Sequence, residues 1–227
     1  MRTYIEVNTT EMPEKEQEMN VLNLTYKWRQ PISHPEKVLS QLMQQAQGMC
    51  QTYLFEWGAI AGSQEQFRAF VWSITELQRC DPLTLPQEQQ VAFWVNLHNI
   101  LIIHTYVMLG PLGNQNFFER KSFFSKYKYN VNGLTYTIKQ IFRGILLNNQ
   151  KNQFSKNDPR MKYVLGPHFA DARILSTLSH LYVDPPVLLS LSLSLSLSLS
   201  LSPPLSLTIK SQDKGDANHP LVQLWHV

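Results

Sequence analysis

Apolar residues recur with helical spacing through the first half of the chain. From Pro35 onward they occupy positions i, i+3, i+4 and i+7, at Val38, Leu39, Leu42, Met43, Ala46, Met49, Cys50 and Tyr53. A second stripe follows the capping-box pattern Ser63-x-x-Gln66, at Phe67, Phe70, Val71, Ile74 and Leu77. The spacing predicts two amphipathic helices, the first of which begins at Pro35 because proline suits the first helical position.

The longest predicted element runs from about Gln87 to Leu109, where Gly110-Pro111 stops it. It is apolar nearly all round, which predicts a central helix buried on every side. A transmembrane span is not expected, because polar side chains interrupt the segment before any run reaches eighteen apolar residues, namely Asn96, His98, Asn99 and His104.

Beyond this helix the period of the pattern changes. The segments 127–131 and 134–138 flank Asn132-Gly133, which predicts a β-hairpin. Thr137-x-x-Gln140 is a second capping-box pattern and predicts a short helix through Leu147, followed by a polar loop over 148–157. Two short apolar runs, 161–165 and 173–178, predict strands. The fold class is therefore α+β, with a helical N-terminal half, a long buried central helix, then a hairpin, a short helix and short strands.

The C-terminal part has a different composition from the rest. There is no charged residue between Asp184 and Lys210, and 189–202 is a strict Leu-Ser alternation. We expect three regions: a polar, frayed N-terminal segment (1–33), a globular domain (34–179) and a low-complexity tail (180–227). The alternation is a strand pattern without gatekeeper charges, and as a membrane span it is slightly short. Because a CT dinucleotide repeat encodes Leu-Ser in whichever frame it is read, the tail is best interpreted as disordered chain or an artefact of the gene model.

Basic residues are concentrated in one window. The formal net charge is +3, but residues 119–162 hold ten bases against Glu119 and Asp158, a net +8 that leaves −5 elsewhere. Among these bases, candidates for binding an anionic ligand are Lys126, Lys128, Arg143 and Arg160. The window is also rich in Phe and Tyr, a combination that can bind single-stranded nucleic acid. Inward packing of aromatic residues from alternating strand positions is the favoured interpretation, so nucleic-acid binding is not the main expectation.

Three polar residues of the central helix are the candidates for catalysis. At about 100° per residue, Asn96, Asn99 and His104 fit within an arc of about 140°, whereas His98 points away. One interpretation is that they form hydrogen bonds with the backbone of a neighbouring loop or of the hairpin. The other is that they line a pocket in which His104 carries or orients a proton.

No nucleophile motif, cofactor motif or helical metal site is present in the sequence. The seven histidines include no i, i+4 pair, and Cys50 and Cys80 fit as buried apolar residues. We therefore expect no metal and no cofactor.

Several linked motifs resemble the domain of unknown function 547 (DUF547) family. The segment 92–99, Ala-Phe-Trp-Val-Asn-Leu-His-Asn, followed by His104 and Gly110, resembles the family's A-F-W-[IV]-N-x-[YH]-N helix. The segment 137–147 resembles its S-L-x-x-I-E-x-G-I-L element, and Asp158-Pro159-Arg160 and 171–174 resemble its D-P-R and D-x-R-I elements. The resemblance covers about 34–179 and implies an intracellular domain without an agreed activity.

Two departures from the family pattern bear on function. Phe142 stands where the family has a glutamate, and a cysteine-containing turn expected after the D-x-R-I element is absent. We therefore expect a C-terminally truncated protein-interaction or scaffold module, cytoplasmic and without catalytic activity. The alternatives are a remnant of a hydrolase or transferase with a pocket around His104, Asn96 and Asn99, and a nucleic-acid-binding segment at 119–162.

Overall fold

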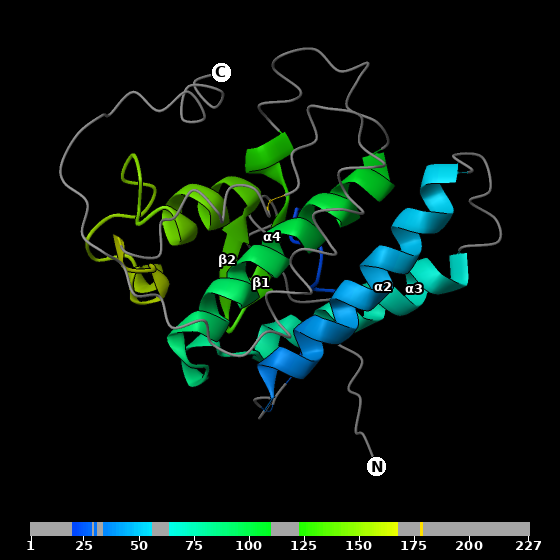
Figure 1. Ribbon diagram of the computed structural model, residues 1–227, viewed down its shortest axis with the longest axis horizontal. Helices are drawn as coiled ribbons and strands as arrows, with labels where there is room; N and C mark the ends of the chain where they lie inside the picture. Colours follow the sequence, from blue (N-terminus) through cyan, green and yellow to red (C-terminus); the bar gives the residue numbers. More distant parts are fainter. Residues whose placement is uncertain are drawn as a thin grey trace, which may run out of the picture.

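The computed structural model of the chain describes residues 20–28, 30, 34–55, 64–109, 123–167 and 178. Within these, helix α2 (Pro35–Phe55) lies beside α3 (Gln64–Ser73), and both flank the long helix α4 (Gln87–Leu109). The hairpin of β1 (Lys128–Val131) and β2 (Leu134–Thr137) lies on another side of α4 (Figure 1). The expected α+β class is therefore confirmed.

Helix α4 is the centre of the core, as its sequence predicted. Every residue from Phe93 to Tyr106 is buried. Among the described residues, this helix alone is long and apolar enough to cross a membrane, and 78% of its apolar window is buried inside the protein. Such burial is typical of the core helix of a soluble protein.

Local signals set the ends of several elements. Helix α2 begins at Pro35, as predicted. Beyond α3 the chain tightens into a 3-10 helix, η1 (Ile74–Arg79), and a second 3-10 turn, η2 (Pro82–Thr84), begins after the N-cap Asp81. The first capping-box pattern includes Ser63, which lies outside the described residues.

The hairpin turn has the conformation that its sequence predicted. Asn132 has φ 48° and Gly133 has φ 80°, so both central residues adopt the left-handed conformation that a two-residue type I′ turn requires. The register pairs Tyr129 with Tyr136 and Asn130 with Thr135. Alternate residues of β1 point inward, so Tyr129 and Val131 are buried.

The second capping box is formed. The Thr137 N–H donates to Gln140 Oε1 at 3.1 Å, and the Gln140 N–H donates to Thr137 Oγ1 at 3.1 Å. The predicted helix follows, but residues Gln140–Leu146 form the wider π-helix, η4. A Cβ at Gly144 would overlap the ring of Phe154, so only glycine lets the following loop pack this closely.

One predicted strand is wrong. Residues 161–165 were expected to be extended, but Pro159–Tyr163 is a 3-10 helix, η5. Asp158 caps it, because its Oδ1 accepts from the Arg160 N–H at 2.9 Å, and Pro159 occupies the first helical position. The other predicted strand, 173–178, lies outside the described residues except for Leu178, and so does the tail.

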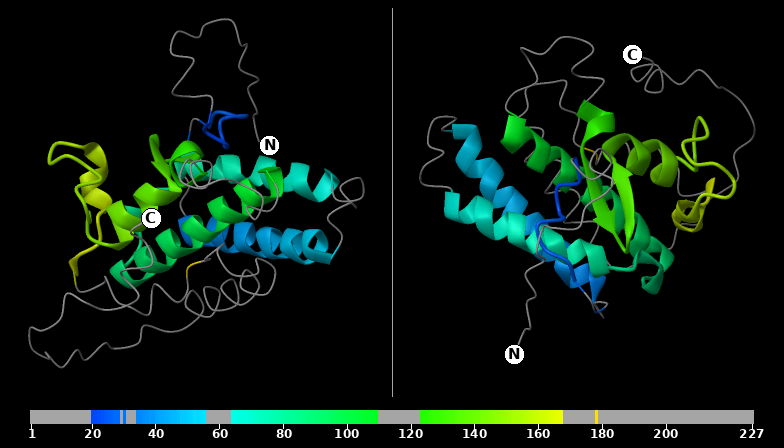
Figure 2. Two further views of the ribbon diagram at one scale, coloured as in Figure 1. Left: turned by 90° about the horizontal axis from the view of Figure 1, so that it is seen from above. Right: turned by 180° about the vertical axis from the view of Figure 1, so that it is seen from behind.

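The N-terminal segment differs from the expectation of a frayed region where it is described. Residues 20–23 lie along β1 (Figure 2), Tyr26 and Trp28 contact η1, and Val21, Asn23 and Tyr26 are buried. Their hydrogen bonds join residues far apart in sequence, which a local pattern does not reveal.

Candidate functional site

His104 is held in an apolar environment between α3 and the hairpin. Its Nδ1 and the Tyr129 hydroxyl share a hydrogen bond of 2.9 Å. The rings of Phe67 and Phe70 meet the imidazole edge to face, at centroid distances of 5.6 and 5.2 Å. Burial lowers the pKa of His104 to about 3, so the imidazole is neutral at physiological pH. The hydrogen bond connects α4 to β1. Because the imidazole is neutral and its pKa is far below 7, His104 is not suited to carry a proton near neutral pH.

The two candidate asparagines make their described contacts elsewhere. Asn99 is fully buried, and its Oδ1 lies 3.3 Å from Nδ1 of His98. Asn96 is 2% exposed, and its Oδ1 has no hydrogen-bond partner within the described part of the chain. Although the three candidates share one arc of the helix, the partners that the structure gives His104 and Asn99 lie on different elements.

A second polar junction, which no sequence motif indicated, lies between α4 and β2. Trp94 is 5.0 Å from Tyr136 and 5.9 Å from Tyr163 between ring centroids. The indole Nε1 of Trp94 and the hydroxyl of Tyr136 are both buried without a partner among the described residues. Burial, with a smaller contribution from Tyr163, raises the pKa of Tyr136 far above its usual range, so its hydroxyl stays protonated.

A charged residue, Asp81, lies at the edge of this junction. The Tyr163 hydroxyl lies 3.4 Å from Asp81 Oδ1 and accepts from Asn132 Nδ2 at 3.0 Å. The only sequence signal for the buried tyrosines was their inward strand position, which indicates packing but not a partner.

Of the four basic candidates, Arg160 is the most fully engaged. It donates to both carboxylate oxygens of Asp158, at 2.9 and 2.6 Å, and to the Thr135 carbonyl at 3.0 Å, and it lies over the Phe154 ring. The hydrogen bond from Arg160 lowers the pKa of Asp158. Arg160 therefore fastens η5 to β2.

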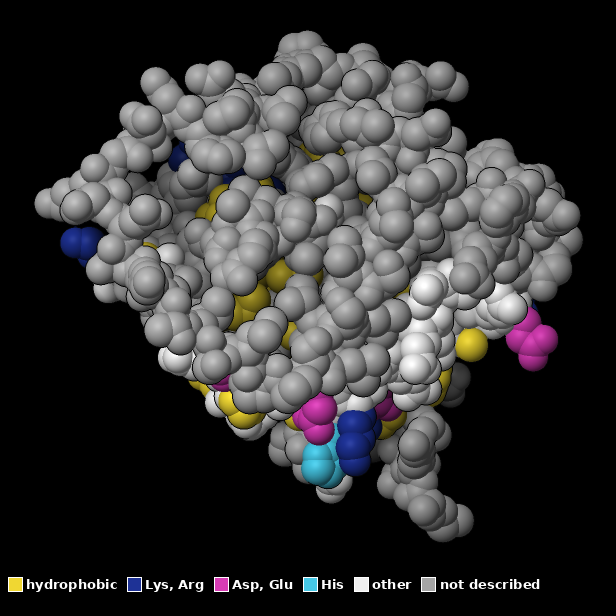
Figure 3. Space-filling view, in the orientation of Figure 1, with side chains coloured by type: hydrophobic (Ala, Val, Ile, Leu, Met, Phe, Trp, Pro, Cys, Tyr) yellow, Lys and Arg dark blue, Asp and Glu magenta, His cyan; other side chains and the backbone are white. Residues whose placement is uncertain are grey.

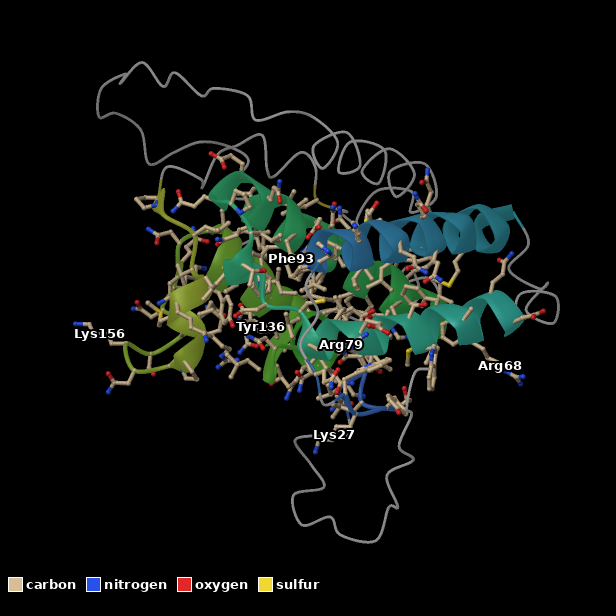
Figure 4. All side chains as sticks on the ribbon, turned by 90° about the horizontal axis from the view of Figure 1, so that it is seen from below. Lys27, Arg68, Arg79, Phe93, Tyr136 and Lys156 are labelled. Carbon is tan, nitrogen blue, oxygen red and sulfur yellow. The ribbon has the colours of Figure 1, made fainter. Side chains whose placement is uncertain are left out.

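The other three candidates are spread over separate elements. Lys126 is exposed beside Tyr127, Lys128 is half-buried in β1 and Arg143 is half-buried in η4. Figure 4 shows other cations, Arg68 and Lys156, pointing outward at opposite ends of the molecule. On the face in Figure 3, described side chains of both charges gather at the lower edge.

The aromatic residues of the basic window pack inward, as favoured from the sequence. Side chains of this window that are at most 5% exposed are Phe123, Tyr129, Tyr136, Phe142 and Phe154, whereas Phe124 and Tyr127 are half-buried. Buried rings cannot stack on nucleic-acid bases, so this observation does not favour the nucleic-acid alternative.

Cys80 has the environment of a packing residue. Its side chain is buried, and burial raises the pKa of the thiol to about 12, so it is protonated and a poor nucleophile. The described residues contain no group of three His, Cys, Asp or Glu side chains that could hold a metal ion. The side chain of Cys50 lies outside the described part.

Phe142, which replaces the glutamate of the family pattern, is buried on η4. Its ring centroid lies 6.1 Å from that of His98. The side chain beside the buried His98 is thus apolar and carries no titratable group, unlike the glutamate of the family pattern.

Comparison with known proteins identifies one family. The family model described as "Protein of unknown function, DUF547" matches residues 82–194. This match contains α4, the hairpin, η4 and η5, begins later than the expected 34 and continues past 179 into the Leu-Ser repeat. No curated protein and no solved structure is significantly similar to the chain. The chain is therefore a DUF547 domain-containing protein.

Proposed function

We propose that the domain acts as a protein-interaction or scaffold module and not as a catalyst in this chain. Two described side chains of catalytic type, those of His104 and Cys80, have a structural partner or an unreactive protonation state. His104 is a neutral link to Tyr129, and the Cys80 thiol is buried and protonated.

The observation that carries this proposal is a cluster of three aromatic residues and one arginine beside α3, in which Trp72 is exposed and Tyr26 is buried; we name it the aromatic patch (Tyr26, Trp28, Trp72 and Arg79). The Trp72 side chain is 43% exposed, and its ring lies 5.0 Å from that of Tyr26. Tyr26 meets Trp28 at 5.2 Å, and the Arg79 guanidinium lies 3.9 Å above the Trp28 ring. Tryptophan, tyrosine and arginine are the residues most enriched in binding hot spots, so this patch suits a protein partner.

The test compares two exposed apolar residues in the full-length protein. Trp72→Ser removes the exposed ring of the patch, and Met108→Ser is the matched control, because Met108 is 45% exposed on α4. Proteins cross-linked to the wild-type chain in cells are identified, and their affinities for the purified variants are measured. We expect Trp72→Ser to lower the affinity of a true partner by at least about tenfold, whereas Met108→Ser leaves this affinity unchanged. Partners that bind all three proteins equally would contradict the proposal.

The enzyme alternative has a separate readout. If the domain hydrolysed esters or peptides through a pocket at α4, His104→Gln would abolish turnover without changing partner binding. A hydrolytic activity that is lost in this variant would replace the interaction proposal by the enzyme alternative.

A further inference from the structure

Residues 20–28 form a segment that we name the N-terminal strap, and its first four residues, 20–23, pair with the outer edge of β1. Val21 forms a parallel bridge with Lys128. The Leu22 N–H donates to the Lys128 carbonyl at 2.9 Å, and the Lys128 N–H donates to the Asn20 carbonyl at 2.9 Å. The strap therefore begins as a third strand beside the hairpin.

At Asn23 the pairing passes from backbone to side chain. Its Nδ2 donates to the Asn130 carbonyl at 2.8 Å, and its Oδ1 accepts from the Asn130 N–H at 2.8 Å. A carboxamide carries one donor and one acceptor side, as a backbone residue does, so it imitates the next residue of a strand. The same Nδ2 also donates to the Ile74 carbonyl at 3.2 Å, and Asn23 is fully buried.

The strap satisfies all the outward backbone groups of two β1 residues. In an antiparallel hairpin closed by a two-residue turn, Tyr129 and Val131 bond to β2, and the N–H and C=O groups of Lys128 and Asn130 point outward. These four groups are the recognition surface that an added strand uses. Here the strap occupies every one of them.

Helix η1 forms the other wall. The side chain of Gln78 donates to the carbonyls of Asn23 and Tyr26, and Trp28 Nε1 donates to Thr75 Oγ1 at 2.9 Å. The hydrogen-bond partners named for the strap lie 47 to 108 residues from it in sequence. None of the contacts depends on the covalent connection, so the same segment from another chain could make them.

We infer that the edge of β1 and helix η1 form a docking site for an extended peptide, and that the N-terminal strap occupies this site in cis. The inference rests on the proposed interaction function and specifies its partner, whose aromatic residue takes the place of Tyr26 against Trp72, because Tyr26 and Trp28 belong to both the strap and the aromatic patch. The partner presents an apolar residue, an asparagine two positions later and an aromatic residue three positions after that, as Val21, Asn23 and Tyr26 do. Backbone pairing supplies affinity, and the buried carboxamide supplies specificity because an apolar substitute leaves the Asn130 groups and the Ile74 carbonyl unpaired.

The first experiment uses amide hydrogen exchange in the wild-type chain. The Lys128 and Asn130 amides bond to the strap, whereas the neighbouring Tyr129 amide bonds within the hairpin. If the strap detaches while the domain stays folded, the Lys128 and Asn130 amides exchange at least about tenfold faster than that of Tyr129. Equal rates for the three amides would show that the strap leaves only on global unfolding, which would overturn the inference.

The second experiment supplies the strap in trans. A fluorescent peptide of residues 18–29 is titrated with the full-length chain and with a Val21→Ala/Asn23→Ala variant, whose folding is checked by circular dichroism. We expect binding to the variant to be at least about tenfold tighter than to the wild type, whose own strap competes at high effective concentration. A control peptide with Asn23→Ala should lose most of this affinity. A folded variant that does not bind the peptide, or that binds both peptides with equal affinity, would overturn the inference.

The two proposals can fail separately. Loss of peptide docking with a partner that still depends on Trp72 would reject only the docking site. Peptide docking without any Trp72-dependent partner would reject the role of the aromatic patch.

Discussion

Tyr129 and Tyr136 face each other across the hairpin, and both are fully buried, yet their hydroxyls differ in one respect. The Tyr129 hydroxyl bonds to His104 at 2.9 Å. The Tyr136 hydroxyl, beside Trp94, has no partner in the described part of the chain. Figure 4 places Tyr136 in the interior, near the middle of the molecule.

The two strands of the hairpin are therefore attached to α4 in two different ways. At β1 a hydrogen bond fixes the strand relative to α4, whereas at β2 the Tyr136 ring packs against Trp94 and its hydroxyl has no partner among the described residues. A paired buried hydroxyl contributes about 1 kcal/mol, but an unpaired one costs about 1–3 kcal/mol. The tyrosine hydroxyl is therefore stabilising on β1 and destabilising on β2, although both rings are buried.

The largest expected effect is the acid sensitivity of the His104–Tyr129 link. Burial lowers the pKa of His104 from 6.5 to about 3. As the pH falls below 6.5, the unfolded chain binds a proton that the folded chain does not bind until about pH 3. The stabilisation is thus complete above pH 6.5 and is lost toward pH 3, by up to roughly 5 kcal/mol at 1.36 kcal/mol per pKa unit.

Urea denaturation at pH 7, 5 and 4 measures this loss. His104→Gln removes the titrating group, so the variant should lose less stability than the wild type between pH 7 and 4, although it starts from a lower value at pH 7. Parallel pH profiles for the two proteins would show that His104 is not the acid-sensitive group.

The elements that were predicted correctly are those whose signals are local. Asn132-Gly133 requires only the left-handed conformation of its own two residues, and Thr137-x-x-Gln140 bonds within four residues. The predicted strand at 161–165 failed because the cap at Asp158-Pro159 dominates over a short apolar run. The strap was missed because Asn23 pairs with Asn130, 107 residues away.

The second prediction compares two variants that each lack one tyrosine hydroxyl, one on β1 and one on β2. Tyr129→Phe leaves the Nδ1 of buried His104 unpaired and should lower the free energy of unfolding by about 1–3 kcal/mol. Tyr136→Phe removes a hydroxyl that has no described partner, and it should be neutral or stabilising. Chemical denaturation of both variants measures the difference. Equal losses would mean that Tyr136 also has a hydrogen-bond partner.

The candidate site was only partly predictable for the same reason. The burial of Asn96, Asn99 and His104 follows from the apolar surroundings of the helix. Their partners do not, because the pairing of His104 with Tyr129 depends on how the hairpin docks on α4, which residue spacing along α4 does not specify.

The third prediction concerns the outer edge of β2. Arg160→Met removes the bond to the Thr135 carbonyl and leaves the Asp158 carboxylate without its cation. Because the Arg160 and Asp158 side chains are 21% and 14% exposed, solvent screens part of this loss, and we expect about 1–2 kcal/mol. Lys156→Met, at an exposed loop position, is the control and should leave the melting temperature unchanged. A similar melting temperature for both variants would show that Arg160 does not anchor β2.

The smallest expected effect is at the end of β2, where the capping box joins the strand to η4. Thr137→Ala removes the acceptor of the Gln140 N–H and should cost about 1 kcal/mol, whereas Thr137→Ser keeps the hydroxyl and should retain most of the stability. Thermal unfolding of the two variants measures this difference. Because the Tyr136 hydroxyl has no partner among the residues that the structure describes, Thr137→Ala should destabilise a Tyr136→Phe background by the same amount as the wild type. In a Tyr129→Phe background, where the bond to α4 is also lost, its effect should be larger. Equal effects in both backgrounds would indicate that the two strands are attached independently.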